Sequence, residues 1–249
     1  MTPSLNSQAS SFQAKNLELP ILSEIFGKIP FGRVILGLYD TDSQFSALMV
    51  NIAAEQLKAN GNLLYLSSFK PTPELRQQFN NLGVNVAEHE AKDDAVLNDA
   101  YSAQAGVKSN EKYHFASPNL NDISIAVTQS APQWPAGTLV VVEYFSAIAM
   151  NQESVFAKFS RKVAGVWRAQ GSIMIAGLAL DTHPSPFYSE MKLIVDGVFE
   201  LKLIEHKGEM VNAIRSRSLR GQLSDTRWRK VLFDEKMKAS LQLLEQPTG

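Results

Sequence analysis

The chain has 249 residues, of which 45% are hydrophobic and 20% are charged, and its formal net charge is −1. That length predicts one domain with a large core, and the near-neutral charge excludes a protein that binds polyanions over its whole surface. Cysteine is absent, which excludes disulfides, thiolate nucleophiles and cysteine-bound metals.

Residues 1–17 are rich in Ser, Gln and Asn and carry no apolar core of the kind that a secretory signal needs. They are predicted to be a flexible tail, which leaves 18–249 as a single domain. The longest apolar runs, at 139–142 and 173–180, are far shorter than the roughly 20 residues that span a bilayer. We therefore expect a cytoplasmic protein without a membrane segment.

Strand and helix patterns alternate along the chain. Short apolar runs predict strands at 31–38, 62–68, 139–142 and 172–180. Apolar residues at helical spacing predict helices at 43–60, 73–82, 151–170 and 185–193. Such alternation favours a mostly parallel sheet with helices on both faces.

The middle of the chain gives weaker signals. Residues 84–86 are compatible with a short strand, and 87–117 have little periodicity and are interpreted as a variable insertion. Ser117 and Pro118 form a plausible N-cap and first-turn pair for a following helix.

The segment from Gly37 to Gln44 lies between a predicted strand and a predicted helix, where a phosphate-binding loop reads Gly-x-x-x-x-Gly-Lys-Ser/Thr. Asp42 stands at the second glycine, Ser43 at the lysine and Gln44 at the hydroxyl residue. Loss of the lysine removes about 1.5–3 kcal/mol, and a carboxylate near a phosphate, with Asp40 adding another, contributes repulsion of up to about 4 kcal/mol. We expect no tight ATP binding; the alternative is an ordinary strand-to-helix turn.

The sequence after this loop resembles the RecA-like ATPases of the KaiC family. The similarity covers the helix from Ser46, the Asn60-Gly61 turn and a strand of the Leu-Tyr-Leu-Ser type, and continues into Ser68-Phe-Lys-Pro-Thr-Pro-Glu. In that family, paired glutamates in this last segment polarise the attacking water. Lys70 and Pro71 occupy those positions here, so the resemblance implies that the general base is lost.

An apolar strand at 139–142 ends in Glu143. The resemblance places this residue in the second ATPase motif, where an aspartate normally holds magnesium through water. Glu143 keeps the charge on a longer side chain. The alternative is a carboxylate that lies in solvent at the strand end or caps the next helix.

The C-terminal region carries a further part of the resemblance. Asp196-Gly-Val-Phe-Glu-Leu201 is similar to the Ala-Asp-Gly-Val-Ile-Glu-Leu of the family's closing hairpin. Ser218-Leu-Arg220-Gly221 is similar to the Lys-x-Arg-Gly that reaches the neighbouring subunit's nucleotide, with Ser218 in place of the lysine. Over 18–235 the resemblance implies a RecA-like, P-loop-type α/β fold with a C-terminal antiparallel hairpin, altered at the positions that touch ATP.

A basic run lies near the C-terminus. It consists of Arg215, Arg217, Arg220, Arg227, Arg229 and Lys230, with Trp228 among them. Because side chains alternate along a strand, Arg215 and Arg217 are predicted to share one face, where they would bind phosphates or stack on bases. The alternative is a subunit interface, in which arginine and tryptophan are common. We favour the interface, since the related proteins assemble through this edge.

The histidines give no sign of a metal site. His89, His114, His183 and His206 lack the spacing of metal ligands, and we expect them to be exposed in loops. The acidic residues at 88–90 and 93–94 are interpreted as a solvated face. We expect no metal and no cofactor.

These patterns predict a catalytically inactive homologue of the RecA/KaiC-like ATPases. It would act as a structural or regulatory subunit of a homo- or hetero-oligomer, such as a ring with RecA-like paralogues. A second hypothesis is a nucleic-acid-binding module, similar to recombinase paralogues or to an Elongator-type ring subunit, that uses the basic C-terminal strand. A third is an ATPase with displaced residues, in which Lys70 replaces the loop lysine and Glu143 holds magnesium.

Overall fold

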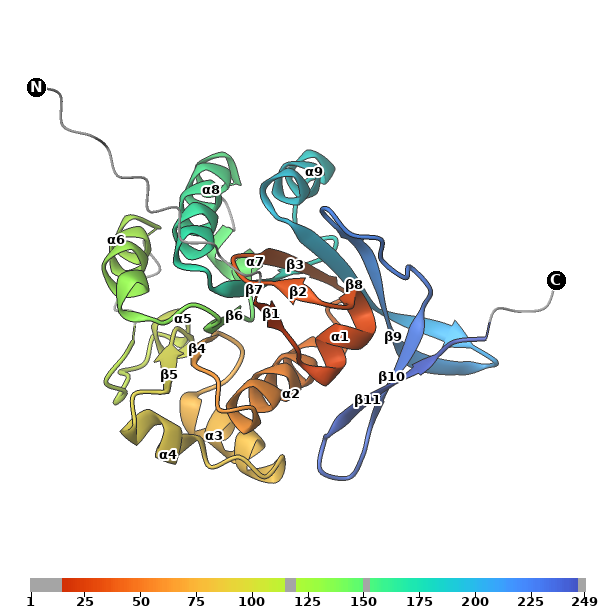
Figure 1. The fold of residues 1–249 in the computed structure, drawn as a ribbon, viewed down its shortest axis with the longest axis horizontal. Coiled ribbons are helices and arrows are strands. Elements are labelled where there is room, and N and C mark those ends of the chain that lie inside the picture. The colour runs from red at the N-terminus through yellow and green to blue at the C-terminus, as the bar shows by residue number, and fades with distance from the viewer. Residues whose placement is uncertain (1–14, 115–119, 150–152, 246–249) are drawn as a thin grey trace, which may run out of the picture.

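The computed structural model describes residues 15–114, 120–149 and 153–245. Within them the chain forms a nine-stranded sheet with helices on both faces and a separate two-stranded sheet of β1 and β2 (Figure 1). The strands are β1 (Asn16–Leu17), β2 (Ile29–Pro30), β3 (Val34–Tyr39), β4 (Leu63–Ser67), β5 (Ala95–Asp99), β6 (Leu139–Val142), β7 (Ile173–Ala179), β8 (Gly197–His206), β9 (Glu209–Leu219), β10 (Arg229–Phe233) and β11 (Ala239–Leu243).

The helices alternate with the strands of the parallel part. They are α1 (Pro20–Phe26), α2 (Phe45–Lys58), α3 (Thr72–Asn81), α4 (Val86–Ala91), α5 (Tyr101–Ala105), α6 (Leu120–Ser130), α7 (Phe145–Ala149), α8 (Glu153–Gln170) and α9 (Ser185–Ile194), with a 3-10 turn at Ala131–Gln133. The predicted strands and helices outside the middle region are confirmed to within three residues at each end.

The large sheet has the strand order β11-β10-β9-β8-β3-β7-β6-β4-β5. Strands β8, β3, β7, β6, β4 and β5 run parallel, and β9, β10 and β11 continue the sheet as antiparallel strands. The predicted mostly parallel sheet with helices on both faces and a C-terminal antiparallel hairpin is therefore confirmed.

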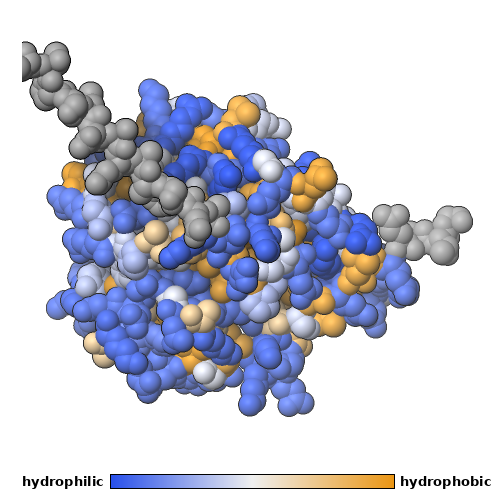
Figure 2. All heavy atoms as spheres, in the orientation of Figure 1, coloured by the Kyte–Doolittle hydropathy of each residue, from blue (hydrophilic) through white to orange (hydrophobic). Residues whose placement is uncertain are grey.

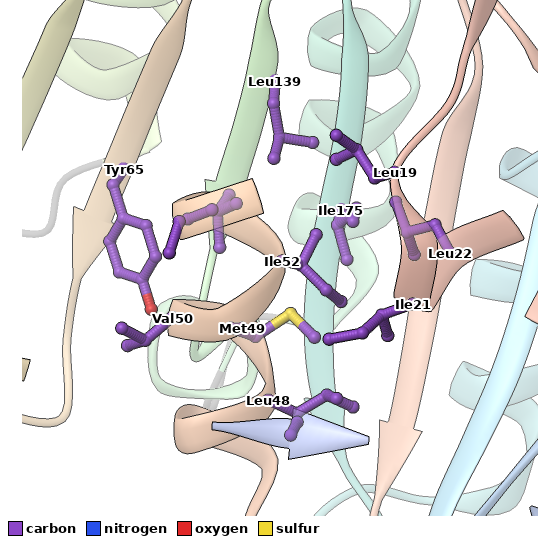
Figure 3. Packing of buried hydrophobic residues seen from close by; sticks show 14 of the residues in the cluster. Leu19, Ile21, Leu22, Leu48, Met49, Val50, Ile52, Tyr65, Leu139 and Ile175 are labelled. Carbon is purple, nitrogen blue, oxygen red and sulfur yellow. The ribbon is translucent and has the colours of Figure 1, made fainter. Parts of the chain in front are cut away.

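The sheet separates two apolar layers. Helices α1, α2 and α3 pack on one face, and α6, α8 and α9 pack on the other (Figure 1). Strands β3, β6 and β7 are buried along their whole length, because parallel strands covered on both sides need apolar residues at every position. Figure 3 shows Ile52 of α2 next to Ile175 of β7, and Met49 of the same helix directed toward Ile21 of α1.

Two predictions for the chain outside this frame need correction. No strand forms at 84–86, because Val86 begins α4 and is buried there as an anchor of that helix. Asn16 and Leu17, which the sequence predicts to belong to a flexible tail, form β1, where Asn16 pairs with Pro30 and Leu17 is buried. The described part of the predicted variable insertion, 87–114, contains most of α4, the edge strand β5 and α5, which are each too short to show a period. The predicted cap at Ser117 and Pro118 lies outside the described residues.

An asparagine closes part of the outer edge of the sheet. The Asn51 side chain of α2 donates to the Met237 carbonyl at 2.8 Å and accepts from the Ala239 amide at 2.8 Å. It therefore pairs with the start of β11 as a neighbouring strand would. This contact joins α2, the helix that follows the candidate loop, to the C-terminal hairpin.

Candidate functional site

The candidate site lies at the carboxyl edge of the parallel strands. The loop at 40–44 follows β3, Lys70 and Pro71 follow β4, and Glu143 follows β6. Because parallel strands end on the same edge, the fold brings these separate segments together. In open α/β sheets, ligands bind outside this edge.

The loop is shorter than the sequence pattern predicts. Strand β3 continues to Tyr39, so Gly37 lies inside the sheet, opposite Gly177 of β7 and Phe199 of β8. No residue from Gly37 to Gln44 has a positive φ. A cradle of backbone N–H groups around an anion requires left-handed residues in alternation with right-handed ones. This turn has none.

Phe45 fills the space above the two sheet glycines. Its ring stacks on Tyr39 with 4.0 Å between the ring centroids and also faces Phe199 at 6.2 Å. A Cβ atom on Gly37 would lie 2.8 Å from the Phe45 ring and 2.6 Å from the Phe199 ring, and one on Gly177 would overlap the Phe45 ring. In this structure, Gly37 makes room for the Phe45 and Phe199 rings, and Gly177 makes room for the Phe45 ring and the Glu143 carbonyl oxygen.

The loop donors and acceptors are used within the protein. The Gln44 amide at the start of α2 donates to Asn212 Oδ1 of β9 at 2.8 Å. The Ser43 amide and hydroxyl both donate to the Asp40 carbonyl. The Asp40 carboxylate accepts from the Leu203 amide of β8 at 3.1 Å. The predicted loop residues thus join α2 to the β8–β9 hairpin, while Asp42 remains exposed.

Glu143 is completely buried, so the predicted alternative of a solvent-exposed strand-end carboxylate is wrong. Its Oε1 accepts a short hydrogen bond from the Ser46 hydroxyl, and its Oε2 has no partner among the described residues. Burial raises the pKa of Glu143, although Lys70 and Ser46 act in the opposite direction. Burial also raises the pKa of Tyr65, whose hydroxyl lies near this carboxyl group without a hydrogen bond of good geometry.

Magnesium prefers ionised oxygen ligands and water, and the burial of Glu143 works against its ionised form. The Ser46 hydroxyl also occupies the side of Glu143 that is closest to α2. Figure 3 shows Tyr65 directed toward Val50 of the same helix. Glu143 therefore acts in this structure as a link between β6 and α2.

The two residues at the positions of the catalytic glutamates have structural contacts. Lys70 is buried, and its ammonium group donates to Gln78 Oε1 of α3 at 2.8 Å. Pro71 is the residue that precedes the first turn of α3.

Arg215 and Arg217 reach the same side of the hairpin, as predicted. Both bind the buried carboxylate of Glu200, at 2.8 Å and 2.7 Å. A register shift near Phe199 places both arginines within reach of that one side chain. Burial alone would raise the pKa of Glu200, but the hydrogen bonds from the two arginines lower it. The Arg215 guanidinium also lies 4.4 Å from the ring centre of Trp228.

The other basic residues are paired as well. Arg227 and Arg229 both bind Asp225, at 2.8 Å and 2.7 Å. Arg220 donates to the Leu193 carbonyl at the end of α9, at 2.7 Å. Lys230 lies 3.8 Å from Glu209. The structure thus distributes the basic run among several local contacts.

Two features were missed by the sequence analysis. Asp196 accepts from the Val34 amide at 2.9 Å and from Arg168 at 2.8 Å, so the Asp-Gly sequence before β8 holds the start of β3 and the end of α8. His183 is buried, contrary to the expectation of an exposed loop histidine, and lies 3.2 Å from Glu153. Its apolar neighbour Phe187, four residues later, is the only local signal of that burial. No group of metal-ligating side chains occurs among the described residues.

The architecture and the edge geometry define a RecA/KaiC-like α/β fold. The KaiC-like protein PH0186 from the hyperthermophilic archaeon Pyrococcus horikoshii OT3 has a similar structure, with a TM-score of 0.69 and 13% sequence identity over 93% of this chain and 100% of that one. No family model and no curated protein matches the sequence. At that identity the similarity establishes the fold alone.

The part of the chain that the structure describes has no helix long and apolar enough to cross a membrane. On the face seen in Figure 2, hydrophobic residues lie in small groups among hydrophilic ones.

Proposed function

We propose that this chain is a RecA/KaiC-like protein that neither binds ATP in the usual way nor hydrolyses it, and that it serves as a structural or regulatory subunit of a homo- or hetero-oligomer. A ring with RecA-like paralogues is one such assembly. The observation that carries the proposal is the position of Phe45, whose ring covers Gly37 and Gly177 above a loop without left-handed residues. A phosphate needs a set of inward-facing backbone N–H groups, which a loop of this conformation does not present.

The contacts of the residues at the catalytic positions support the proposal. Glu143 is buried against Ser46, and Lys70 is held by Gln78. The third hypothesis, an ATPase that uses Lys70 and Glu143 as replacements, would require both side chains to leave these contacts. Breaking a buried hydrogen bond to a charged group costs about 1.5–3 kcal/mol.

Three large apolar side chains near the C-terminal hairpin are exposed. Leu193 at the end of α9 is 70% exposed, Met210 of β9 is 60% exposed, and Leu223 in the loop after β9 is fully exposed. Met210 lies at the opposite end of β9 from Leu223, so the three side chains do not form one patch. Single exposed apolar side chains are common on monomers, so the proposal does not rest on them.

The nucleic-acid alternative has less support. Arg215 and Arg217 share the buried Glu200, and Arg227 and Arg229 share Asp225, so phosphates would compete with these carboxylates. Each pair leaves one positive charge in excess over its carboxylate. That excess is small for binding dominated by counterion release.

Phosphate release from Mg-ATP tests the proposal. We expect the same rate for the wild type, for Glu143→Gln and for buffer alone, because a residue that holds no magnesium can lose its charge without effect. Glu143→Gln is a suitable variant since burial already favours the neutral form of this side chain. Turnover in the wild type that Glu143→Gln abolishes would contradict the proposal.

A further inference from the structure

An aromatic surface lies at the same carboxyl edge. Phe69 follows β4 and Tyr144 follows β6, and their rings are stacked with centroids 4.9 Å apart and planes 15° from parallel. Tyr39 meets Phe69 edge-on at 6.4 Å. Phe69 is 38% exposed, and Tyr144 is partly buried against the core. Since β4 and β6 are hydrogen-bonded neighbours, the stack is held on a rigid support.

Carboxylates without ionic partners lie along this edge. Asp42 follows β3, Glu74 is in the first turn of α3, and Asp181 follows β7. All three are exposed, and none forms an ion pair within the described residues. The nearby Lys70 is buried and directed to Gln78. The edge is therefore both aromatic and negatively charged.

The chain's own arginines are already engaged. Each of the nine has an acidic or carbonyl partner in the structure: Arg33 and Arg168 with Asp196, Arg76 with Glu90 and Glu111, Arg161 with Glu190, Arg215 and Arg217 with Glu200, Arg220 with Leu193, and Arg227 and Arg229 with Asp225. In a second copy of this chain every guanidinium would therefore already share its charge with a partner, whereas an arginine of another protein need not.

We propose that this edge binds an arginine side chain of a different protein. A planar guanidinium stacks on aromatic faces and binds carboxylates with two parallel hydrogen bonds, which a lysine ammonium cannot do. The Phe69–Tyr144 stack supplies the first contact, and Asp42 and Asp181 supply the charge. The inference rests on the proposed function, because a nucleotide at this edge would occupy the same region.

Blocked peptides test the inference by NMR titration. The probe is Gly-Arg-Gly-Arg-Gly, and its matched control contains citrulline, the neutral analogue of arginine. We expect saturable shifts near Phe69 and Tyr144 with a millimolar dissociation constant for the arginine peptide, and binding at least fivefold weaker for the citrulline peptide. Phe69→Ala and Tyr144→Ala should each weaken binding at least threefold.

Two control variants distinguish loss of the aromatic contact from an effect that any substitution would have on peptide binding. Phe69→Tyr keeps the ring and should retain wild-type binding, and Leu193→Ala removes an exposed side chain on α9 and should have no effect. Equal binding of both peptides, or binding unchanged by Phe69→Ala, would overturn the inference.

Addition of Mg-ATP to the same samples distinguishes the two proposals. Absence of ATP binding together with failure of the arginine peptide removes the inference and leaves the proposed function intact. Saturable ATP binding that displaces the peptide contradicts the proposed function, on which the inference rests.

Discussion

At the scale of single residues, the environment of a side chain decides its role more than its place in a motif does. Gly37 fits the first glycine of a phosphate loop, yet its missing Cβ makes room for Phe45 and Phe199. Glu143 fits a magnesium ligand, yet it is buried and bonded to Ser46. Both residues link secondary-structure elements at the edge where ligands of open α/β sheets bind.

Glu55 gives a residue-scale prediction. Its carboxylate accepts from the Ile21 amide at the start of α1, and burial raises its pKa from 4.5 to about 7. At pH values between these two pKa values, the carboxyl group is more protonated in the folded state than in the unfolded state. The free energy of unfolding therefore falls as the pH rises from about 4.5 to about 7.

Glu55→Gln should remove that part of the pH dependence. We expect the variant to match the wild type near pH 4.5 and to exceed it by about 1 kcal/mol at pH 8, after allowance for solvent screening of a partly exposed group. Urea unfolding at several pH values measures the difference. Glu235→Gln, in an exposed turn, is the control. If the free energies of unfolding of Glu55→Gln and the wild type differed by the same amount at pH 4.5 and pH 8, Glu55 would not be the titrating group.

At the scale of elements, the C-terminal hairpin and α2 support each other. Asn212 of β9 caps α2 through the Gln44 amide, and Asn51 of α2 pairs with the start of β11. Asp40 adds a contact to β8. The turn after β3 is therefore held by a contact to β9 through Gln44 and a contact to β8 through Asp40.

Replacement of Asn51 tests this coupling. Asn51→Ala leaves the Ala239 amide without its side-chain partner, and an unsatisfied buried donor costs about 1–3 kcal/mol. We expect the free energy of unfolding to fall by that amount and hydrogen exchange to quicken at Ala239. Asn80→Ala, at an exposed position of α3, should change stability by less than about 0.5 kcal/mol. Equal effects of the two variants would argue against a bridging role.

At the scale of the whole molecule, the sequence predicted the parallel sheet well because its buried strands are continuous apolar runs with helical patterns between them. It failed where elements are short, as at Val86, and where a single apolar neighbour decides burial, as at His183. The altered loop could be located from Asp42, Ser43 and Gln44. The position of the Phe45 ring over Gly37 and Gly177 could not be predicted, because Phe45 meets Gly177 only after the chain has folded.

The charge distribution is also a property of the whole molecule. Four arginines of the hairpin region share the carboxylates of Glu200 and Asp225, whereas the acidic residues Asp42, Glu74 and Asp181 at the carboxyl edge have no ionic partner within the described chain. The overall net charge of −1 conceals this asymmetry. It is consistent with an edge that meets a cation from another protein in place of a nucleotide phosphate.

Isothermal titration of the protein with Mg-ATP, at concentrations that detect millimolar affinity, tests the central claim most directly. The triple variant Asp42→Gly, Ser43→Lys and Gln44→Thr, which restores the loop sequence, serves as a matched comparison. The account predicts no saturable heat for the wild type, and none for the triple variant while Phe45 still covers Gly37 and Gly177. Saturable binding of ATP by the wild type would contradict it.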